Sequence, residues 1–165
     1  MHLTRFRIMT VCTGNICRSP MAEVVLRDRL EAAGLDGLVD VDSTGVSDEE
    51  HGNPIDPRAR RTLADHGYAV PGRRARRVPA PQLAERDLVL AMTSGHAAAL
   101  RRLDGTADIR LLRSFDPTAA VGGPDHLLDV DDPWYGPDAA FEQTLAEIEA
   151  AADGVVSHVR AALDR

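Results

Sequence analysis

The chain has no lysine, only two cysteines in 165 residues, and aromatic residues at 4%. Cys12 and Cys17 are too few and too close together for the disulfide framework that stabilises small secreted proteins. The longest apolar stretches, such as residues 88–92, are far shorter than the roughly 20 residues of a membrane-spanning helix, and no signal-peptide pattern follows the N-terminus. We therefore expect a cytoplasmic protein without a membrane partner.

Positive charge is scarce in the last part of the chain. Residues 1–121 carry 17 arginines against 16 acidic residues, whereas residues 122–165 carry 2 arginines against 10 acidic residues, and the net charge is −7. This balance argues against a nucleic-acid partner. The arginine-rich run at residues 73–77 fits a solvated loop better than a nuclear or nucleic-acid signal.

The length and the 44% hydrophobic content favour a single domain over residues 1–165. Strand-length runs alternate with segments whose apolar residues repeat at helical spacing. The runs lie at residues 5–11, 38–43, 87–92 and 109–112, and the helical segments at 20–33, 57–66, 94–103 and 141–163. This alternation predicts an α/β fold with a parallel four-stranded sheet and helices on both faces. Ser19 is the predicted N-cap of the first helix, and Gly34 and Gly67 the C-terminal stops of the first two.

The segment between the first predicted strand and helix reads Cys12-Thr13-Gly14-Asn15-Ile16-Cys17-Arg18-Ser19. Such a loop lies at the carboxyl edge of a parallel sheet and directs backbone N–H groups and the positive end of the helix dipole into one small volume. Gly14 and Asn15 are residue types that tolerate left-handed backbone angles. We therefore predict a phosphate-binding loop after the first strand.

Cys12 is expected at the base of this loop, where the amides, the dipole and Arg18 favour the nucleophilic thiolate. Arg18 can donate two hydrogen bonds to phosphate oxygens, and Ser19 can hydrogen-bond the sulfur when it leaves. A lone cysteine is often a small core residue, but Arg18 and Ser19 at this spacing favour catalysis. For Cys17, loop packing and reversible disulfide protection of Cys12 both stay open. A metal pair is disfavoured, because no second Cys or His pair completes a ligand set.

A proton donor for the departing oxygen is expected in the run at residues 129–136, DVDDPWYG. Three carboxylates lie close together in this run, and their mutual repulsion favours protonation of one of them. Its two aromatic residues offer a stacking surface to an aromatic leaving group. We choose Asp132 over Asp131, because Pro133 restricts the backbone of the residue before it. The alternative interpretation of the run is an ordinary solvated acidic loop.

These motifs resemble those of the low-molecular-weight protein tyrosine phosphatases. VCTGNICRSPMAE at residues 11–23 is similar to the signature loop of that family, DPWYG at residues 132–136 is similar to its acid loop, and the likeness covers nearly the whole chain. The resemblance implies hydrolysis of phosphotyrosine in protein substrates through a cysteinyl-phosphate intermediate, by a monomer without a cofactor. It implies Cys12 as nucleophile, Arg18 as phosphate clamp and Asp132 as general acid and then base. No metal is expected, because the loop itself supplies positive charge.

The resemblance also implies two groups of supporting residues. A hydrogen-bonded network that braces the loop is expected from Asn15, Ser19, Ser43 and His66. Read alone, His66 is a histidine at a helix C-terminus, where the dipole favours it. The substrate is expected against Thr13, Gly14, Asn15, Ile16, Cys17, Ser19, Trp134 and Tyr135.

The chain departs from the family at residues 48–52, where the family often places an aromatic residue such as tryptophan and this chain has Glu49, Glu50 and His51. Carboxylates there are expected to repel acidic flanks of a phosphopeptide and to favour basic ones. Two other functions use a similar phosphate-binding loop. An arsenate reductase of the multi-cysteine type needs cysteines after Cys17, and the chain has none. A phosphate-dependent binding module needs neither Cys12 nor Asp132.

Overall fold

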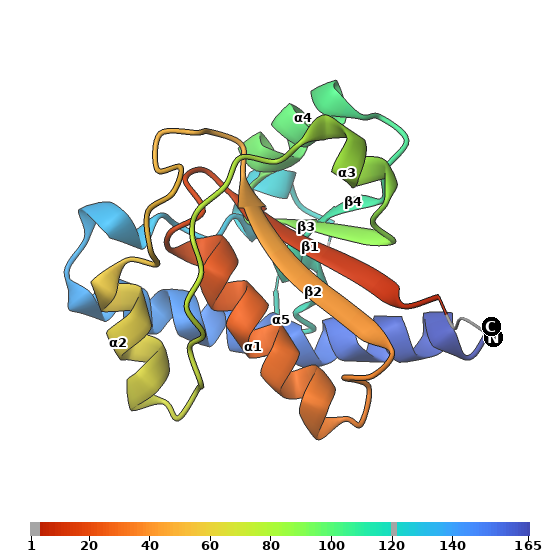
Figure 1. Ribbon diagram of the computed structural model, residues 1–165, viewed down its shortest axis with the longest axis horizontal. Helices are drawn as coiled ribbons and strands as arrows, with labels where there is room; N and C mark the ends of the chain where they lie inside the picture. The colour runs from red at the N-terminus through yellow and green to blue at the C-terminus, as the bar shows by residue number, and fades with distance from the viewer. Residues whose placement is uncertain (1–3, 120–121) are drawn as a thin grey trace.

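Four parallel strands form the sheet of the computed structural model, which describes residues 4–119 and 122–165. Their order is β2-β1-β3-β4, and each neighbouring pair is parallel (Figure 1). The strands are β1 (Phe6–Cys12), β2 (Val39–Gly45), β3 (Leu88–Ala91) and β4 (Ile109–Leu111). The predicted α/β fold with four parallel strands is therefore confirmed.

Helices cover both faces of the sheet. Figure 1 shows α1 and α5 on one face, with α2 beside them, and α3 and α4 on the other. The α-helices of the described residues are α1 (Arg18–Ala32), α2 (Pro57–Asp65), α3 (Ala80–Ala84), α4 (Ser94–Leu103) and α5 (Asp138–Leu163). None of them is both long and apolar enough to cross a bilayer.

Four short helical elements were not predicted from the sequence, because none is long enough to display a repeating apolar pattern. They are α3 and the 3₁₀ turns η1 (Leu112–Phe115), η2 (Asp125–Leu128) and η3 (Pro133–Tyr135). Two of the four matter for function, since α3 and η3 carry residues that contact the site described below.

Two apolar clusters hold the layers together, one on each side of the sheet. In β1, Ile8 packs in the cluster that α1 and α5 share, and Met9 packs in the cluster beneath α3 and α4; both side chains are fully buried. Phe141, Leu145 and Ile148 present a buried stripe of α5 to the first cluster. Full burial of each such side chain contributes about 1.5–3 kcal/mol. Burial on both faces explains why β3 is a continuous apolar run without alternation.

The ends of the helices correct one prediction and confirm two. The first helix begins at Arg18 with Cys17 at the N-cap position, and no side chain caps it. Ser19 is not the cap, because its hydroxyl is used behind the loop. Gly34 and Gly67 have φ of 74° and 85°, in the left-handed region that ends a helix. Both glycines therefore act as the predicted stops.

Candidate active site

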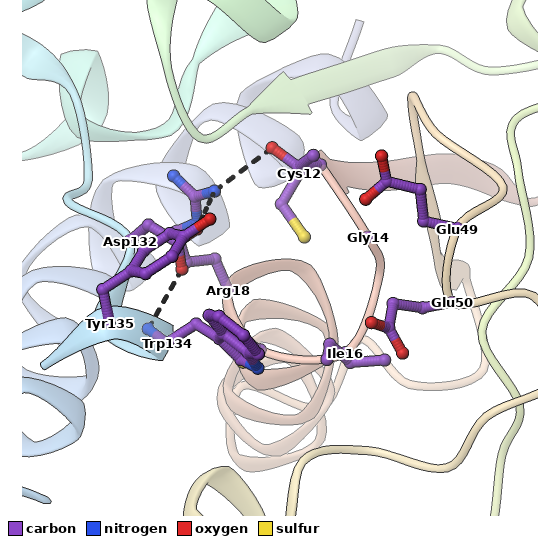
Figure 2. A pocket seen from close by; sticks show the side chains of 11 residues that line it. Cys12, Gly14, Ile16, Arg18, Glu49, Glu50, Asp132, Trp134 and Tyr135 are labelled. Atoms are coloured by element: carbon purple, nitrogen blue, oxygen red, sulfur yellow. Dashed lines mark hydrogen bonds and ion pairs between the residues drawn. The ribbon is translucent and has the colours of Figure 1, made fainter.

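The loop that joins β1 to α1 forms the base of a pocket of ≈ 140 Å³. Figure 2 shows Cys12 at its centre, with Asp132, Trp134 and Tyr135 on one side and Glu49 and Glu50 on the other. The lining residues are Cys12, Thr13, Gly14, Ile16, Cys17, Arg18, Glu49, Glu50, Asp132, Trp134 and Tyr135. Asn15 and Ser19, expected against the substrate as well, do not line the pocket and are fully buried behind the loop.

Close packing determines the backbone of this loop. Asn15 has φ of 61°, as predicted, but Gly14 does not adopt a positive φ. A Cβ at Gly14 would lie 3.1 Å from Cγ of Glu50, a tight contact with a side chain that can shift. Gly45, at the end of β2, approaches the loop more closely, because its Cβ would lie 2.5 Å from the carbonyl oxygen of Thr13. A larger residue at position 45 would push the loop away from β2.

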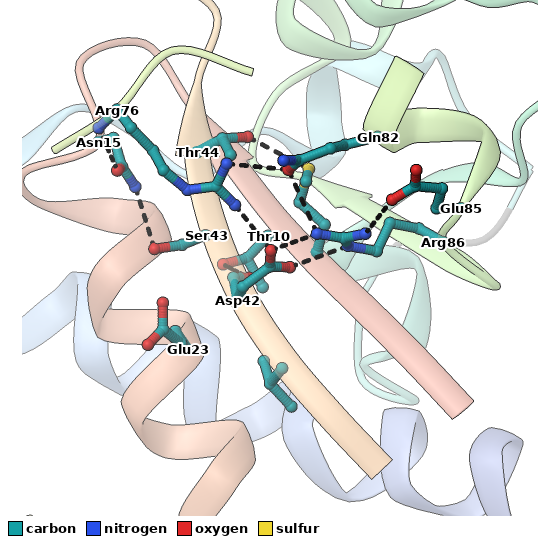
Figure 3. A network of polar contacts seen from close by, with 12 residues as sticks. Thr10, Asn15, Glu23, Asp42, Ser43, Thr44, Arg76, Gln82, Glu85 and Arg86 are labelled. Carbon is teal, nitrogen blue, oxygen red and sulfur yellow. Dashed lines mark hydrogen bonds and ion pairs between the residues drawn. The ribbon is translucent and has the colours of Figure 1, made fainter. Parts of the chain in front are cut away.

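The side chain of Asn15 connects the loop to β2 and to the segment before α3. Its Nδ2 donates to Ser19 Oγ at 2.8 Å and to Ser43 Oγ at 3.0 Å. Its Oδ1 accepts hydrogen bonds from the backbone N–H of Arg76, at 3.0 Å, and from the guanidinium of Arg73. Figure 3 shows Asn15 between Ser43 and Arg76. Four hydrogen bonds thus stabilise the one left-handed non-glycine residue of the described chain.

His66 lies outside this network, contrary to what the resemblance implied. It follows the end of α2, where its Nε2 is 2.6 Å from Glu142 Oε2 on α5. The pKa of the exposed His66 ring is raised, mainly by this hydrogen bond to Glu142. Arg73 and Arg76 hold Asn15 instead, and both are half-buried, so the prediction of a solvated loop was wrong for these two arginines.

A second layer of charge supports Arg76. The carboxylate of Asp42, on β2, accepts from Arg76 Nη2 at 2.7 Å and from Arg86 Nη2 at 2.5 Å (Figure 3). Gln82, on α3, accepts from Arg76 Nη1 at 2.8 Å. The short helix α3 therefore anchors the segment whose backbone holds Asn15. The sequence carries no local signal for this role, because Asp42 and Asn15 lie 34 and 61 residues from Arg76 along the chain.

The sulfur of Cys12 is buried at the end of β1, 3.0 Å from Ser19 Oγ. The Ser19 hydroxyl already accepts from Asn15, and its single proton has two acceptors within reach, the sulfur and the carbonyl oxygen of Thr44 at 3.2 Å. When Cys12 is a thiol, its S–H can donate to Ser19 while Ser19 donates to Thr44. When Cys12 is a thiolate, the Ser19 proton can turn to the sulfur.

Arg18 is buried at the N-terminus of α1, and its guanidinium is held from three directions. Nη1 donates to the carbonyl oxygen of Val130 at 3.0 Å. Nη2 donates to Thr13 Oγ1 at 3.4 Å and lies 3.5 Å from Asp132 Oδ2. The carboxylate of Asp132 also accepts from the backbone N–H of Trp134 at 3.1 Å, which caps η3 and orients the side chain toward the pocket (Figure 2). The cation and the carboxylate thus face one volume.

Cys17 is a free, buried thiol at the start of α1. Burial is the main cause that raises its pKa, and the nearby carboxylate of Asp56 acts in the same direction. Cys17 therefore stays protonated at neutral pH, unlike the form that a nucleophile needs. Its expected redox role stays a prediction.

The two walls of the pocket differ in chemistry. Trp134 and Tyr135 are exposed and pack edge to face, with ring centroids 4.8 Å apart. On the opposite wall, Glu50 Oε2 accepts from Asn53 Nδ2 at 2.7 Å, which holds that carboxylate beside the loop. His51 is exposed and does not line the pocket. Among residues 4–119 and 122–165, no three histidine, cysteine or acidic side chains gather into a group able to hold a metal ion.

Comparison with known proteins gives a consistent result. The family model described as low molecular weight phosphotyrosine protein phosphatase matches residues 7–165. The low molecular weight protein-tyrosine-phosphatase of Streptomyces coelicolor is 49% identical over 159 residues, which cover 94% of each chain. Low molecular weight protein-tyrosine phosphatase A of Mycobacterium tuberculosis is 44% identical over 146 residues, covering 88% of this chain and 86% of that one. The crystal structure of YfkJ from Bacillus subtilis superposes with a TM-score of 0.84 at 31% identity, covering 95% and 96% of the two chains.

Proposed function

The chain belongs to the low molecular weight phosphotyrosine protein phosphatase family, and from that membership we propose that Cys12, Arg18 and Asp132 carry its reaction through a cysteinyl-phosphate intermediate. One observation supports this proposal above all. A buried thiol, a buried guanidinium and a carboxylate, supplied by β1, α1 and the segment before η3, face a single small pocket. Nucleophile, anion clamp and proton donor are the groups that transfer of a phosphoryl group requires.

In the first step the phosphate lies in the loop, where its oxygens accept hydrogen bonds from backbone N–H groups and from Arg18. The Cys12 thiolate attacks phosphorus, a sulfur–phosphorus bond forms and the bond from phosphorus to the tyrosine oxygen breaks. Asp132, protonated at the start, transfers its proton to that oxygen, so that tyrosine leaves neutral.

In the second step the resulting carboxylate of Asp132 takes a proton from a water molecule, whose oxygen attacks phosphorus. The sulfur–phosphorus bond breaks, and inorganic phosphate and the Cys12 thiolate are released. The Ser19 hydroxyl, 3.0 Å from the sulfur, donates a hydrogen bond to the thiolate as negative charge develops there. Asp132 ends the cycle protonated again.

The walls of the pocket support an aromatic phosphate ester as the substrate. The exposed rings of Trp134 and Tyr135 offer a stacking surface for a phenol, whereas an aliphatic phosphoserine would leave them without a partner. Glu49 and Glu50 favour basic residues beside the phosphotyrosine and disfavour acidic ones. The proposed site is complete within one chain, so the reaction does not need residues from a second copy. The reaction needs a reduced thiol, which supports a cytoplasmic location.

The experiment compares the wild-type protein with Cys12→Ser on a phosphotyrosine peptide and on the matching phosphoserine peptide, with and without EDTA. We expect wild-type turnover of the phosphotyrosine peptide only, unchanged by EDTA, and no turnover by Cys12→Ser. Inorganic phosphate should still raise the melting temperature of Cys12→Ser, because the amides and Arg18 remain; this controls for folding. A fully active Cys12→Ser protein, or activity abolished by EDTA, would overturn the proposal.

A further inference from the structure

His96 is a buried histidine at the site that the proposed reaction does not use. It lies in the first turn of α4, which follows β3 at the same edge of the sheet as the loop, and it is 6% exposed. The side chain of Thr93 caps α4 by accepting the backbone N–H of His96 at 3.1 Å. Asp129 accepts from the backbone N–H of Ser94 at 2.7 Å, which ties this end of α4 to the segment that leads to Asp132.

The ring of His96 reaches the loop through Thr13. His96 Nε2 lies 2.8 Å from Thr13 Oγ1, and the same oxygen accepts from Arg18 Nη2 at 3.4 Å. A guanidinium can only donate hydrogen bonds, so the single proton of the Thr13 hydroxyl is free to point at His96. Either neutral tautomer of the ring makes this bond, because Nε2 can accept from the Thr13 hydroxyl or, when protonated, donate to its oxygen.

The surroundings keep the ring neutral. Burial, and then the charge of Arg18, lower the pKa of His96 to about 4, while Asp129 and Asp132 oppose the shift weakly. The ring is therefore neutral at physiological pH. Nδ1 is buried without a hydrogen-bond partner among the described residues, so the contact with Thr13 is the polar interaction that orients the ring.

We infer that His96 is a positioning residue, which holds the Thr13 hydroxyl by a hydrogen bond and through it directs the guanidinium of Arg18 toward the phosphate. The inference rests on the proposed role of Arg18 as the phosphate clamp. The reason is geometric, because Nη2 of Arg18 has two neighbours, Thr13 Oγ1 and Asp132 Oδ2, at nearly equal distances of 3.4 and 3.5 Å. If the Thr13 oxygen turns away, Nη2 keeps only the carboxylate, and the guanidinium is drawn toward the general acid and away from the cradle.

The test uses His96→Leu, which removes the hydrogen-bonding nitrogen, and His96→Gln, whose side-chain amide can both donate and accept a hydrogen bond. His126→Leu, at an exposed histidine of η2, is the matched control. We expect His96→Leu to lower kcat/KM for a phosphotyrosine peptide about tenfold and to raise the inhibition constant of inorganic phosphate by a similar factor, since one oriented hydrogen bond to the clamp is lost. His96→Gln should restore most of both values, and His126→Leu should match the wild type.

A second pair of variants separates positioning from general destabilisation. On a Thr13→Val background the further change His96→Leu should have almost no effect on kcat/KM, because the two residues act as a unit. Thr13→Ser, which keeps the hydroxyl, should lose much less kcat/KM than Thr13→Val. If His96→Leu does not fold, Thr13→Val still tests the inference, because this single variant should by itself lower kcat/KM about tenfold.

Three results would overturn the inference: wild-type phosphate inhibition in folded His96→Leu, equal losses in the Gln and Leu variants, or fully additive losses with Thr13→Val. Its failure is distinguishable from failure of the proposed function. If the wild-type protein turns over phosphotyrosine and Cys12→Ser does not, the proposed function stands whatever the His96 variants do.

Discussion

Asp131 and Asp132 are adjacent aspartates with different surroundings in the folded protein. Asp132 lines the pocket, lies 3.5 Å from Arg18 and caps η3. Both residues are exposed and border a hollow beside α5, but Asp131 does not line the pocket around Cys12. Pro133 starts η3 directly after Asp132, so the carboxylate at 132 is the one that a rigid backbone aims at the pocket.

We therefore predict different effects of removing each carboxylate. Asp132→Ala should lower kcat/KM for phosphotyrosine on the order of 10²–10⁴-fold, because tyrosine leaves poorly without a proton. The loss should be much smaller for the phosphate ester of an acidic phenol, in the step that forms the intermediate. Pre-steady-state kinetics on both substrates measures the difference.

Asp131→Ala is the matched control for this prediction. It should retain near wild-type rates on both substrates and the limb of the pH profile that reports the acid. If the two variants exchange these behaviours, Asp131 is the general acid.

At the scale of the element, α5 depends on a glycine in its middle. Gly154 lies where the helix crosses η1, and a Cβ at that position would be 2.0 Å from the carbonyl oxygen of Phe115. A backbone oxygen cannot yield as a flexible side chain can. The absent side chain thus lets α5 approach η1, and Phe115 also packs edge to face with His158 one turn further along the helix.

Gly154→Ala should destabilise the protein, although alanine is the better helix former. The gain in helix propensity is about 1 kcal/mol, whereas forcing backbone apart in a packed core costs about 1–3 kcal/mol or more. We expect a net loss of about 1–2 kcal/mol in the free energy of unfolding, measured by denaturant titration. Gly95→Ala, in the first turn of α4, is the control, since its Cβ would meet only Thr93 Oγ1 at an ordinary 3.6 Å. A stabilised Gly154→Ala protein would contradict the prediction.

At the scale of the whole molecule, the acidic C-terminal part of the chain pairs with the arginines and a histidine of the rest. Acidic residues along α5 form ion pairs with side chains from three other elements and the loop after α2. The pairs are Asp138–Arg61, Glu142–His66, Glu147–Arg113, Glu149–Arg29 and Asp153–Arg29. Most of these side chains are partly exposed, so each pair contributes little to stability. Together the pairs bring the acidic C-terminal part of the chain next to positive charge from the rest.

The pH dependence of stability is a property of the whole molecule, and the titration of His96 should contribute to it near pH 5. The unfolded chain binds a proton at His96 near its ordinary pKa of 6.5, whereas the folded protein does so only near 4. Between these values the unfolded state binds more protons, so stability falls as the pH falls, by up to about 1.4 kcal/mol per pH unit. His66 acts in the opposite sense, since its raised pKa favours the folded protein below its ordinary value, but that ring is exposed.

Denaturant titrations of the wild type and of His96→Gln at pH 7, 6 and 5 measure this effect. The difference in the free energy of unfolding between the two proteins should shrink, or change sign, as the pH falls, because the amide does not titrate. Carboxylates that titrate in the same range contribute equally to both proteins and cancel. A difference that is the same at every pH would show that His96 titrates alike in the folded and unfolded chain.

The layers of the fold could be predicted because they repeat local patterns. The helix at residues 94–103 was predicted to the residue, since its apolar spacing begins and ends inside one segment. The predicted end of β2 was two residues short, because its last residues, Thr44 and Gly45, are polar or small and belong to the strand only through pairing with β1. The helices of three to five residues were missed, since they are formed by contacts with the rest of the molecule.

The sequence by itself determined the chemistry of the loop, since Cys12, Arg18 and Ser19 belong to one strand–loop–helix unit whose neighbours in sequence are neighbours in space. Tertiary structure alone decided what holds that loop. His96 is 83 residues from Thr13, Arg73 is 58 residues from Asn15, and Val130 is 112 residues from Arg18. Such contacts form only when the carboxyl ends of parallel strands meet at one edge of the sheet. Local propensity does not distinguish Arg73 from Arg74, or His96 from His66, because the difference between them is where the folded chain brings each side chain.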